Sequence, residues 1–154
     1  MSFASRQDAI DIQNEMPWEK RDRPETLYSM LRDTVDAFPD RPAISYQLLS
    51  GPTDKAQTMT WQQFHDQVCR AANLFRDLKI GESDVVALVL PNSLETAVAT
   101  IGGAVAGIVN PINPLLEPEQ IGAILRETNA KVVVTLKAFP KTDIAQKTAE
   151  AVRH

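Results

Sequence analysis

Apolar residues recur at helical spacing or alternate at strand spacing along the chain, and these two patterns divide it into segments. Residues 25–38 predict a helix that ends where Pro39-Asp40-Arg41-Pro42 cannot continue it. The apolar stripe of this helix is Leu27, Leu31, Val35 and Phe38. Residues 43–48 alternate as a strand, and turn residues at 50–54 lead back towards Thr58-Met59. We therefore expect a helix followed by a β-hairpin.

The segment that follows has a complete helix-start pattern. Thr60 precedes Gln63 at the spacing of a capping box, and Met59 and Phe64 are placed to form a hydrophobic staple. The predicted apolar face consists of Trp61, Phe64, Val68, Ala71, Ala72, Phe75 and Leu78. Gly81 is expected to end the helix in the left-handed conformation.

Continuous apolar stretches without alternation predict strands covered on both faces, as in a parallel sheet. Residues 84–90 and 131–135 are such stretches. Between them we expect a helix that begins at Asn92 or Ser93 and stops at Gly107, rich in small residues that allow close packing. Residues 108–109 predict a short extended piece before a rigid connection over 110–114 that contains two prolines.

Two further helices complete the pattern. Pro118 at a first helical position opens one that runs to about Thr128. Asp143 and Gln146 resemble a capping box at the start of a helix that reaches the chain end. The alternation of helices and buried strands predicts an α/β fold with a partial parallel sheet and flanking helices. With two clear parallel strands, this sheet is small for an independent domain.

Residues 1–24 carry charges of both signs and no sustained helical or strand period. We expect an N-terminal arm that lies across the body, with Trp18 as its anchor because an exposed tryptophan forgoes apolar burial. The predicted organisation is thus an arm over 1–24 and an incomplete α/β domain over 25–154.

Charge and cysteine content limit the partners and the cellular compartment that we expect. Sixteen Lys and Arg against twenty Asp and Glu give a net charge of -4, which provides no attraction for nucleic acid. The longest apolar stretch, 97–109, is too short for a transmembrane helix. A single cysteine, Cys69, cannot form an internal disulfide, and the first residues lack the apolar core of a signal peptide, so we expect a cytoplasmic protein.

Phosphate-binding loops are the first chemistry to test in this fold class. The turn after the first parallel strand, 90–94, contains no glycine, so the dinucleotide-binding pattern is missing. Gly102 and Gly107 have P-loop spacing, but Ile108-Val109 stands where Lys and Ser/Thr must follow. Close helix packing explains these glycines better.

Other candidate residues are equally incomplete. His65 and Cys69, four apart on one helix, lack the further ligands a metal needs. Glu117 and Glu119 flank Pro118 where a helix start attracts acidic residues for dipole reasons. None of four candidate serine nucleophiles lies in a nucleophile elbow: Ser29, Ser45, Ser83 and Ser93. The charge-balanced stretch 20–23 is expected to be solvated. We therefore assign no catalytic, cofactor-binding or metal-binding residue.

The order of segments nevertheless resembles the amino-terminal region of adenylate-forming (AMP-binding) ligases, the acyl-CoA synthetases and fatty-acid-CoA ligases among them. The resemblance covers about residues 25–150. It rests on Phe38-Pro39-Asp40-Arg41-Pro42-Ala43, Thr60-Trp61-Gln62-Gln63-Phe64, 73–81, 84–95, 106–114 and Ala130-Lys131-Val132-Val133-Val134-Thr135. It implies the N-terminal part of the large domain of the ligase fold.

The resemblance also implies a parent enzyme that uses ATP and Mg²⁺ to form an acyl-adenylate and then transfers the acyl group to CoA. The family's phosphate loop, later acidic contacts and catalytic lysine would follow His154. We therefore assign no residue of this chain to ATP, Mg²⁺ or CoA. Some relatives have an arginine on the CoA side at the position of Leu115, and an ionic contact from that position is lost here.

Two hypotheses follow. The first is a scaffold segment of an acyl-CoA synthetase, inactive alone, whose partner is the remainder of the large domain and whose exposed edges favour self-association. The second is a free-standing, non-catalytic α/β binding or interaction module derived from the same framework.

Overall fold

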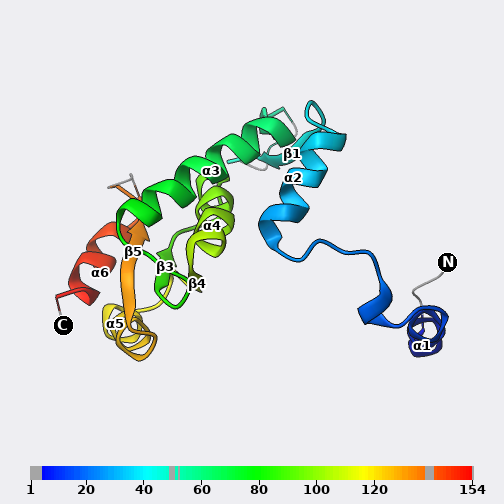
Figure 1. The fold of residues 1–154 in the computed structure, drawn as a ribbon. Helices are drawn as coiled ribbons and strands as arrows, with labels where there is room; N and C mark the ends of the chain where they lie inside the picture. The colour runs from blue at the N-terminus through cyan, green and yellow to red at the C-terminus, as the bar shows by residue number, and fades with distance from the viewer. Residues whose placement is uncertain (1–4, 49–50, 52, 138–140, 154) are drawn as a thin grey trace.

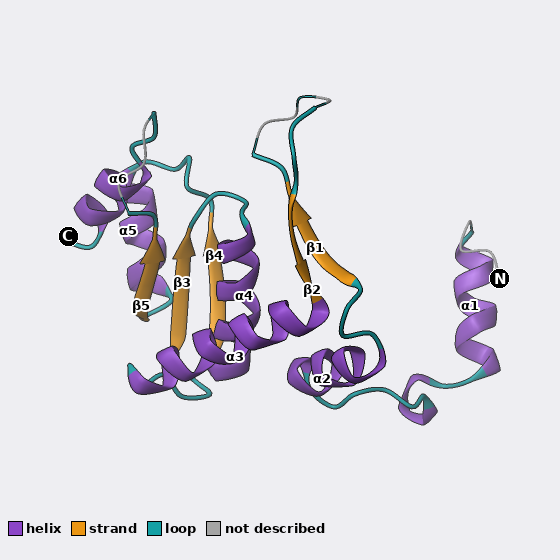
Figure 2. Ribbon diagram, turned by 90° about the horizontal axis from the view of Figure 1, so that it is seen from above, coloured by secondary structure: helices purple, strands orange, loops and turns teal. Residues whose placement is uncertain are grey.

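The computed structural model describes residues 5–48, 51, 53–137 and 141–153. Two views show a mixed α/β body with a separate N-terminal helix (Figures 1 and 2). The expected fold class, α/β with a partial parallel sheet, is confirmed. Among the helices described, none combines the length and apolarity needed to cross a membrane.

The N-terminal residues differ from the predicted arm, which is expected to have no helical period and to lie across the body. They form helix α1 (Arg6–Glu15) and a short 3-10 turn, η1 (Trp18–Lys20), and α1 stands away from the body in both views (Figures 1 and 2). The start of α1 is a capping box of Ser5 and Asp8, which explains a helix without an apolar stripe. Trp18, the predicted anchor, is 60% exposed, and the Arg23 guanidinium lies 4.8 Å from its ring centroid.

Helix α2 (Leu27–Ala37) and the hairpin of β1 (Pro42–Tyr46) and antiparallel β2 (Gln57–Thr60) follow as predicted. The buried face of α2 is narrower than its apolar stripe, because Leu31 and Val35 are buried whereas Leu27 and Phe38 are exposed. Leu31 and Val35 form one apolar cluster with residues of the next helix and the hairpin.

Helix α3 (Trp61–Asp77) begins with the predicted capping box: the Thr60 hydroxyl accepts from the Gln63 backbone N–H at 3.2 Å, and the Gln63 side chain accepts from the Thr60 N–H at 2.9 Å. Its predicted end is wrong. Lys79, not Gly81, has the left-handed conformation, with φ of 65°. The Gly81 N–H instead donates to the Asp84 carboxylate at 2.8 Å.

The central sheet has three parallel strands in the order β4-β3-β5: β3 (Val85–Val89), β4 (Ile108–Ile112) and β5 (Ala130–Thr135). The expectation of two strands with a rigid connection over 110–114 is therefore wrong. Pro111 lies within β4, opposite Leu88. Among the described residues β4 pairs with β3 alone, and an outer strand tolerates a proline whose missing N–H faces away from the neighbouring strand.

Helices cover both faces of the sheet. On one face, α3 and α4 (Leu94–Ala106) pack against Val86 and Leu88. On the other, α5 (Pro118–Glu127) and α6 (Ile144–Ala151) pack against Ala87 and Val89. Successive residues of β3 thus point to opposite cores, which is why the strand has no polar face.

The predicted starts of α4 and α5 are confirmed, whereas the start of α6 differs from its prediction. Ser93 caps α4, its hydroxyl accepting from the Thr96 N–H at 3.1 Å, and Pro118 is at the start of α5. Asp143 precedes α6 but its side chain makes no capping hydrogen bond, so the predicted capping box with Gln146 is wrong. The Asp143 carboxylate lies 3.4 Å from the Lys147 ammonium instead.

Close packing between α3 and α4 explains two of the glycines. A Cβ at Gly102 would lie 2.7 Å from the Cβ of Ala71 on α3, and one at Gly103 would meet a methyl of Val109. Both positions are buried. The small residues therefore bring α4 against α3 and the sheet, as the sequence predicts.

Candidate functional site

An apolar groove of about 1000 Å³ lies at the carboxyl ends of β3 and β5. One wall is helix α3, from which Leu74 and Phe75 line the groove, and the β1–β2 hairpin contributes Met59. The floor is formed by residues at the ends of the strands, including Leu90 after β3 and Val134 in β5. The start of α4 lines it as well, with Val98 and Ala99, so the groove joins five segments of the chain.

The topology explains why the groove opens at this point. The chain leaves β3 for α4 on one face of the sheet and leaves β5 for α6 on the opposite face. Since neighbouring strands send their connections to opposite sides, a crevice forms between the two connections. Such a switch point at the carboxyl ends of parallel strands is the usual place for ligands in α/β sheets.

The hydroxyl groups at this end of the sheet are already engaged. The Thr135 hydroxyl donates to the Val89 carbonyl at 3.2 Å and lies 3.1 Å from the hydroxyl of Thr148. Ser93 is used as the cap of α4. The charged side chains that line the groove are Lys55, Glu95 and Lys137. The groove thus presents mainly a surface for apolar contact.

Sequence reasoning missed this groove because each wall was assigned separately. One signal was available in the sequence, because Leu74 falls outside the predicted apolar stripe of α3; in the structure its side chain is 57% exposed. A large apolar side chain off the buried face of a helix, beside the ends of two buried strands, indicates a surface that other atoms cover.

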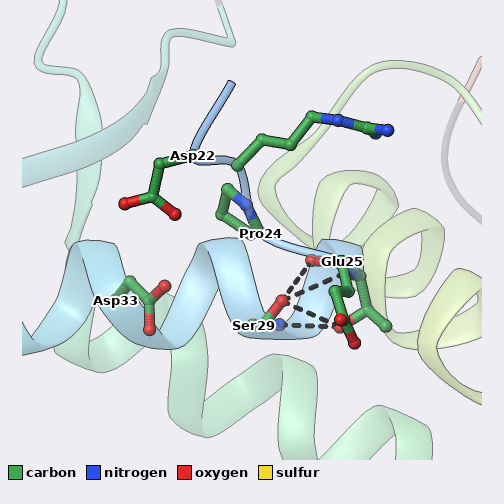
Figure 3. Close-up of a pocket in the computed structure, with 7 residues that line it drawn as sticks. Asp22, Pro24, Glu25, Ser29 and Asp33 are labelled. Atoms are coloured by element: carbon green, nitrogen blue, oxygen red, sulfur yellow. Dashed lines mark hydrogen bonds between the residues drawn. The ribbon is translucent and has the colours of Figure 1, made fainter. Parts of the chain in front are cut away.

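A second, smaller hollow of about 440 Å³ lies where the arm meets the start of α2 (Figure 3). Asp22, Glu25 and Asp33 line it, together with Ser29. The dashed lines in Figure 3 belong to the helix cap: the Ser29 N–H donates to the Thr26 hydroxyl at 3.0 Å. The polar groups therefore serve the start of the helix, where acidic residues and hydroxyls are favoured.

His65 and Cys69 lie together on α3, as their spacing predicts. The Cys69 Sγ is 3.5 Å from the His65 Nε2, and the Tyr28 ring lies 5.9 Å from the imidazole, centroid to centroid. Asp66 is 3.6 Å from the other ring nitrogen. Among the residues that the structure describes, no three His, Cys, Asp or Glu side chains come together as a metal site.

Glu117 links helices α5 and α6 instead of forming a carboxylate pair with Glu119. Its carboxylate lies 3.2 Å from the Lys147 ammonium of α6, and its backbone N–H donates to the Gln120 side chain at 3.0 Å. The hydrogen bond from Lys147 to Glu117, with the nearby charge of Asp143, raises the pKa of Lys147 above its ordinary value. This cluster fastens α5 to α6.

A comparable link joins the starts of two strands. The Asp84 carboxylate accepts from the Gly81 N–H at 2.8 Å and from the Lys131 ammonium at 2.9 Å. These hydrogen bonds lower the pKa of Asp84, the Gly81 bond more than the lysine. Lys131 also donates to the Lys79 carbonyl at 2.6 Å, so the link holds the end of α3 beside the sheet.

The remaining candidates have structural positions. Gly102 lies inside α4 and Gly107 is its C-cap with an extended φ of -166°, so the two do not form a phosphate loop. The Ser45 hydroxyl is 2.7 Å from that of Thr58 across the hairpin. Leu115 is 80% exposed in the connection between β4 and α5.

Comparison with known proteins agrees with the arrangement of strands and helices. The family described as AMP-binding enzyme matches residues 31–154. The chain belongs to this family of AMP-binding enzymes. The resemblance that the sequence motifs indicate is therefore confirmed.

Two curated relatives illustrate this family membership. It is 33% identical over 122 residues to the probable acyl-activating enzyme 12, peroxisomal, of Arabidopsis thaliana, covering 79% of this chain and 20% of the relative. It is 33% identical over 147 residues to a long-chain-fatty-acid–CoA ligase of Bacillus subtilis, covering 92% and 23%. The chain thus spans about a fifth of the length of the curated relatives it matches.

A solved structure shows the same fold. The N-terminal domain of FACL13 from Mycobacterium tuberculosis superposes with a TM-score of 0.64 at 27% identity, over 80% of this chain and 30% of that one. The chain therefore has the fold of part of such an N-terminal domain, in agreement with the prediction from the sequence.

Proposed function

We propose that the chain is the N-terminal segment of an ATP-dependent acyl-CoA synthetase. In the proposed reaction a fatty acid and ATP form an acyl-adenylate and pyrophosphate, and the acyl group then passes to CoA with release of AMP. The observation that carries the proposal is the family match over 31–154, with relatives named as acyl-activating enzymes and CoA ligases.

The role proposed for these residues is that of a scaffold. The three strands are apolar and enclosed by helices on both faces, and the two charged clusters described above fasten elements to each other. Transfer of an acyl group through an adenylate requires neutralisation of phosphate charge and exclusion of water from the mixed anhydride. Among the described residues, no group of three or more His, Cys, Asp or Glu side chains comes together to hold a metal ion.

A pyrophosphate-release assay tests the proposed inactivity of the segment. We expect no release when the folded 154-residue chain receives ATP, Mg²⁺, CoA and a panel of fatty acids, and we expect acyl-CoA formation by the full-length parent protein. Circular dichroism of the same sample checks that the chain is folded. Steady pyrophosphate release by the pure segment would contradict the scaffold role.

The substrate class is proposed as fatty acids because one relative acts, by its name, on long-chain fatty acids. Other relatives are named acetyl-coenzyme A synthetase and benzoate–CoA ligase. Acyl-CoA formation by the full-length protein, measured with acids of increasing chain length and with benzoate, separates these cases. A preference for benzoate would overturn the proposed class.

We also propose that the isolated chain self-associates. The compartment we propose for the protein is the cytoplasm. Unpaired edges of a sheet and uncovered apolar faces favour association. Light scattering over a dilution series provides the measurement, and a monomer at every concentration would contradict the proposal.

The second candidate is a free-standing binding module without catalytic activity. The groove at the carboxyl ends of β3 and β5 favours it, since concave apolar surfaces at that position bind ligands in many α/β proteins. The coding sequence distinguishes the two: a stop directly after His154 favours the module, and continuation into a Ser/Thr- and Gly-rich loop favours the synthetase segment.

A further inference from the structure

We draw no further inference here: the strongest candidate, the His65–Cys69 side-chain pair on the surface of α3 beside Tyr28 of α2, rests on a single cysteine, and no second observation in the described part of the chain points to a ligand for it.

Discussion

The closest approach between α3 and α4 makes Gly102 the position where one added methyl group has the clearest consequence. A Cβ built there lies 2.7 Å from the Cβ of Ala71, 3.1 Å from the Val68 carbonyl oxygen and 3.2 Å from the Ala72 nitrogen. The nearest atoms are backbone or Cβ atoms, which rotamer changes do not move. Gly102→Ala therefore forces the two helices apart.

The expected loss of stability is a difference between two opposing effects. Carbon atoms prefer separations of about 3.5–4.0 Å, so the helices must separate by about 1 Å at the contact. Overpacking of this kind costs about 1–3 kcal/mol, whereas replacing glycine by alanine inside a helix gains about 1 kcal/mol. We expect Gly102→Ala to lower the free energy of unfolding by about 1 kcal/mol, with the packing cost exceeding the gain in helix propensity.

Urea unfolding followed by circular dichroism measures the change, with a double-mutant cycle to isolate its cause. Ala71→Gly removes the opposing methyl group, so the double variant is expected to regain about 1–2 kcal/mol relative to the sum of the single variants. Ala104→Gly, at an exposed position of α4, measures the propensity term alone and is expected to cost about 1 kcal/mol. A Gly102→Ala variant more stable than the parent, or a coupling free energy near zero, would refute this account of the helix contact.

Three further predictions concern other parts of the body. Thr60→Ala removes the cap of α3 and is expected to lower the free energy of unfolding by about 1 kcal/mol in urea titrations, while Thr60→Ser keeps it; equal loss in both would argue against the cap. Ile121→Ala, at a fully buried side chain between α5 and the sheet, is expected to cost about 2–5 kcal/mol, and a loss below 1 kcal/mol would contradict its place in the core. Because its partner Glu117 raises the pKa of Lys147, the ion pair stabilises the fold below the ordinary lysine pKa of 10.5 and loses this effect as the pH rises through the folded pKa. Thermal unfolding from neutral to alkaline pH is expected to show a smaller decline for Glu117→Gln than for the parent, and identical pH profiles would exclude the pair as a contributor.

Local patterns predicted most of the elements because the information lies within a few residues. The capping box at Thr60 and the proline at the start of α5 are contacts between near neighbours, and both are present. The errors came where two local options compete. Lys79 adopts the left-handed conformation in place of Gly81, and β4 pairs with β3 although it contains Pro111.

The fold class, the family and most helix and strand positions follow from the linear sequence, because periodicity and motif order are properties of the chain before it folds. Tertiary structure alone decided that β4 is a strand, that α1 stands away from the body, and that Leu74 faces a groove with the ends of β3 and β5. Each of these depends on atoms brought together from distant segments. Helices and caps form from neighbours in the chain, whereas edges, grooves and their occupants exist only after the strands have been placed in order.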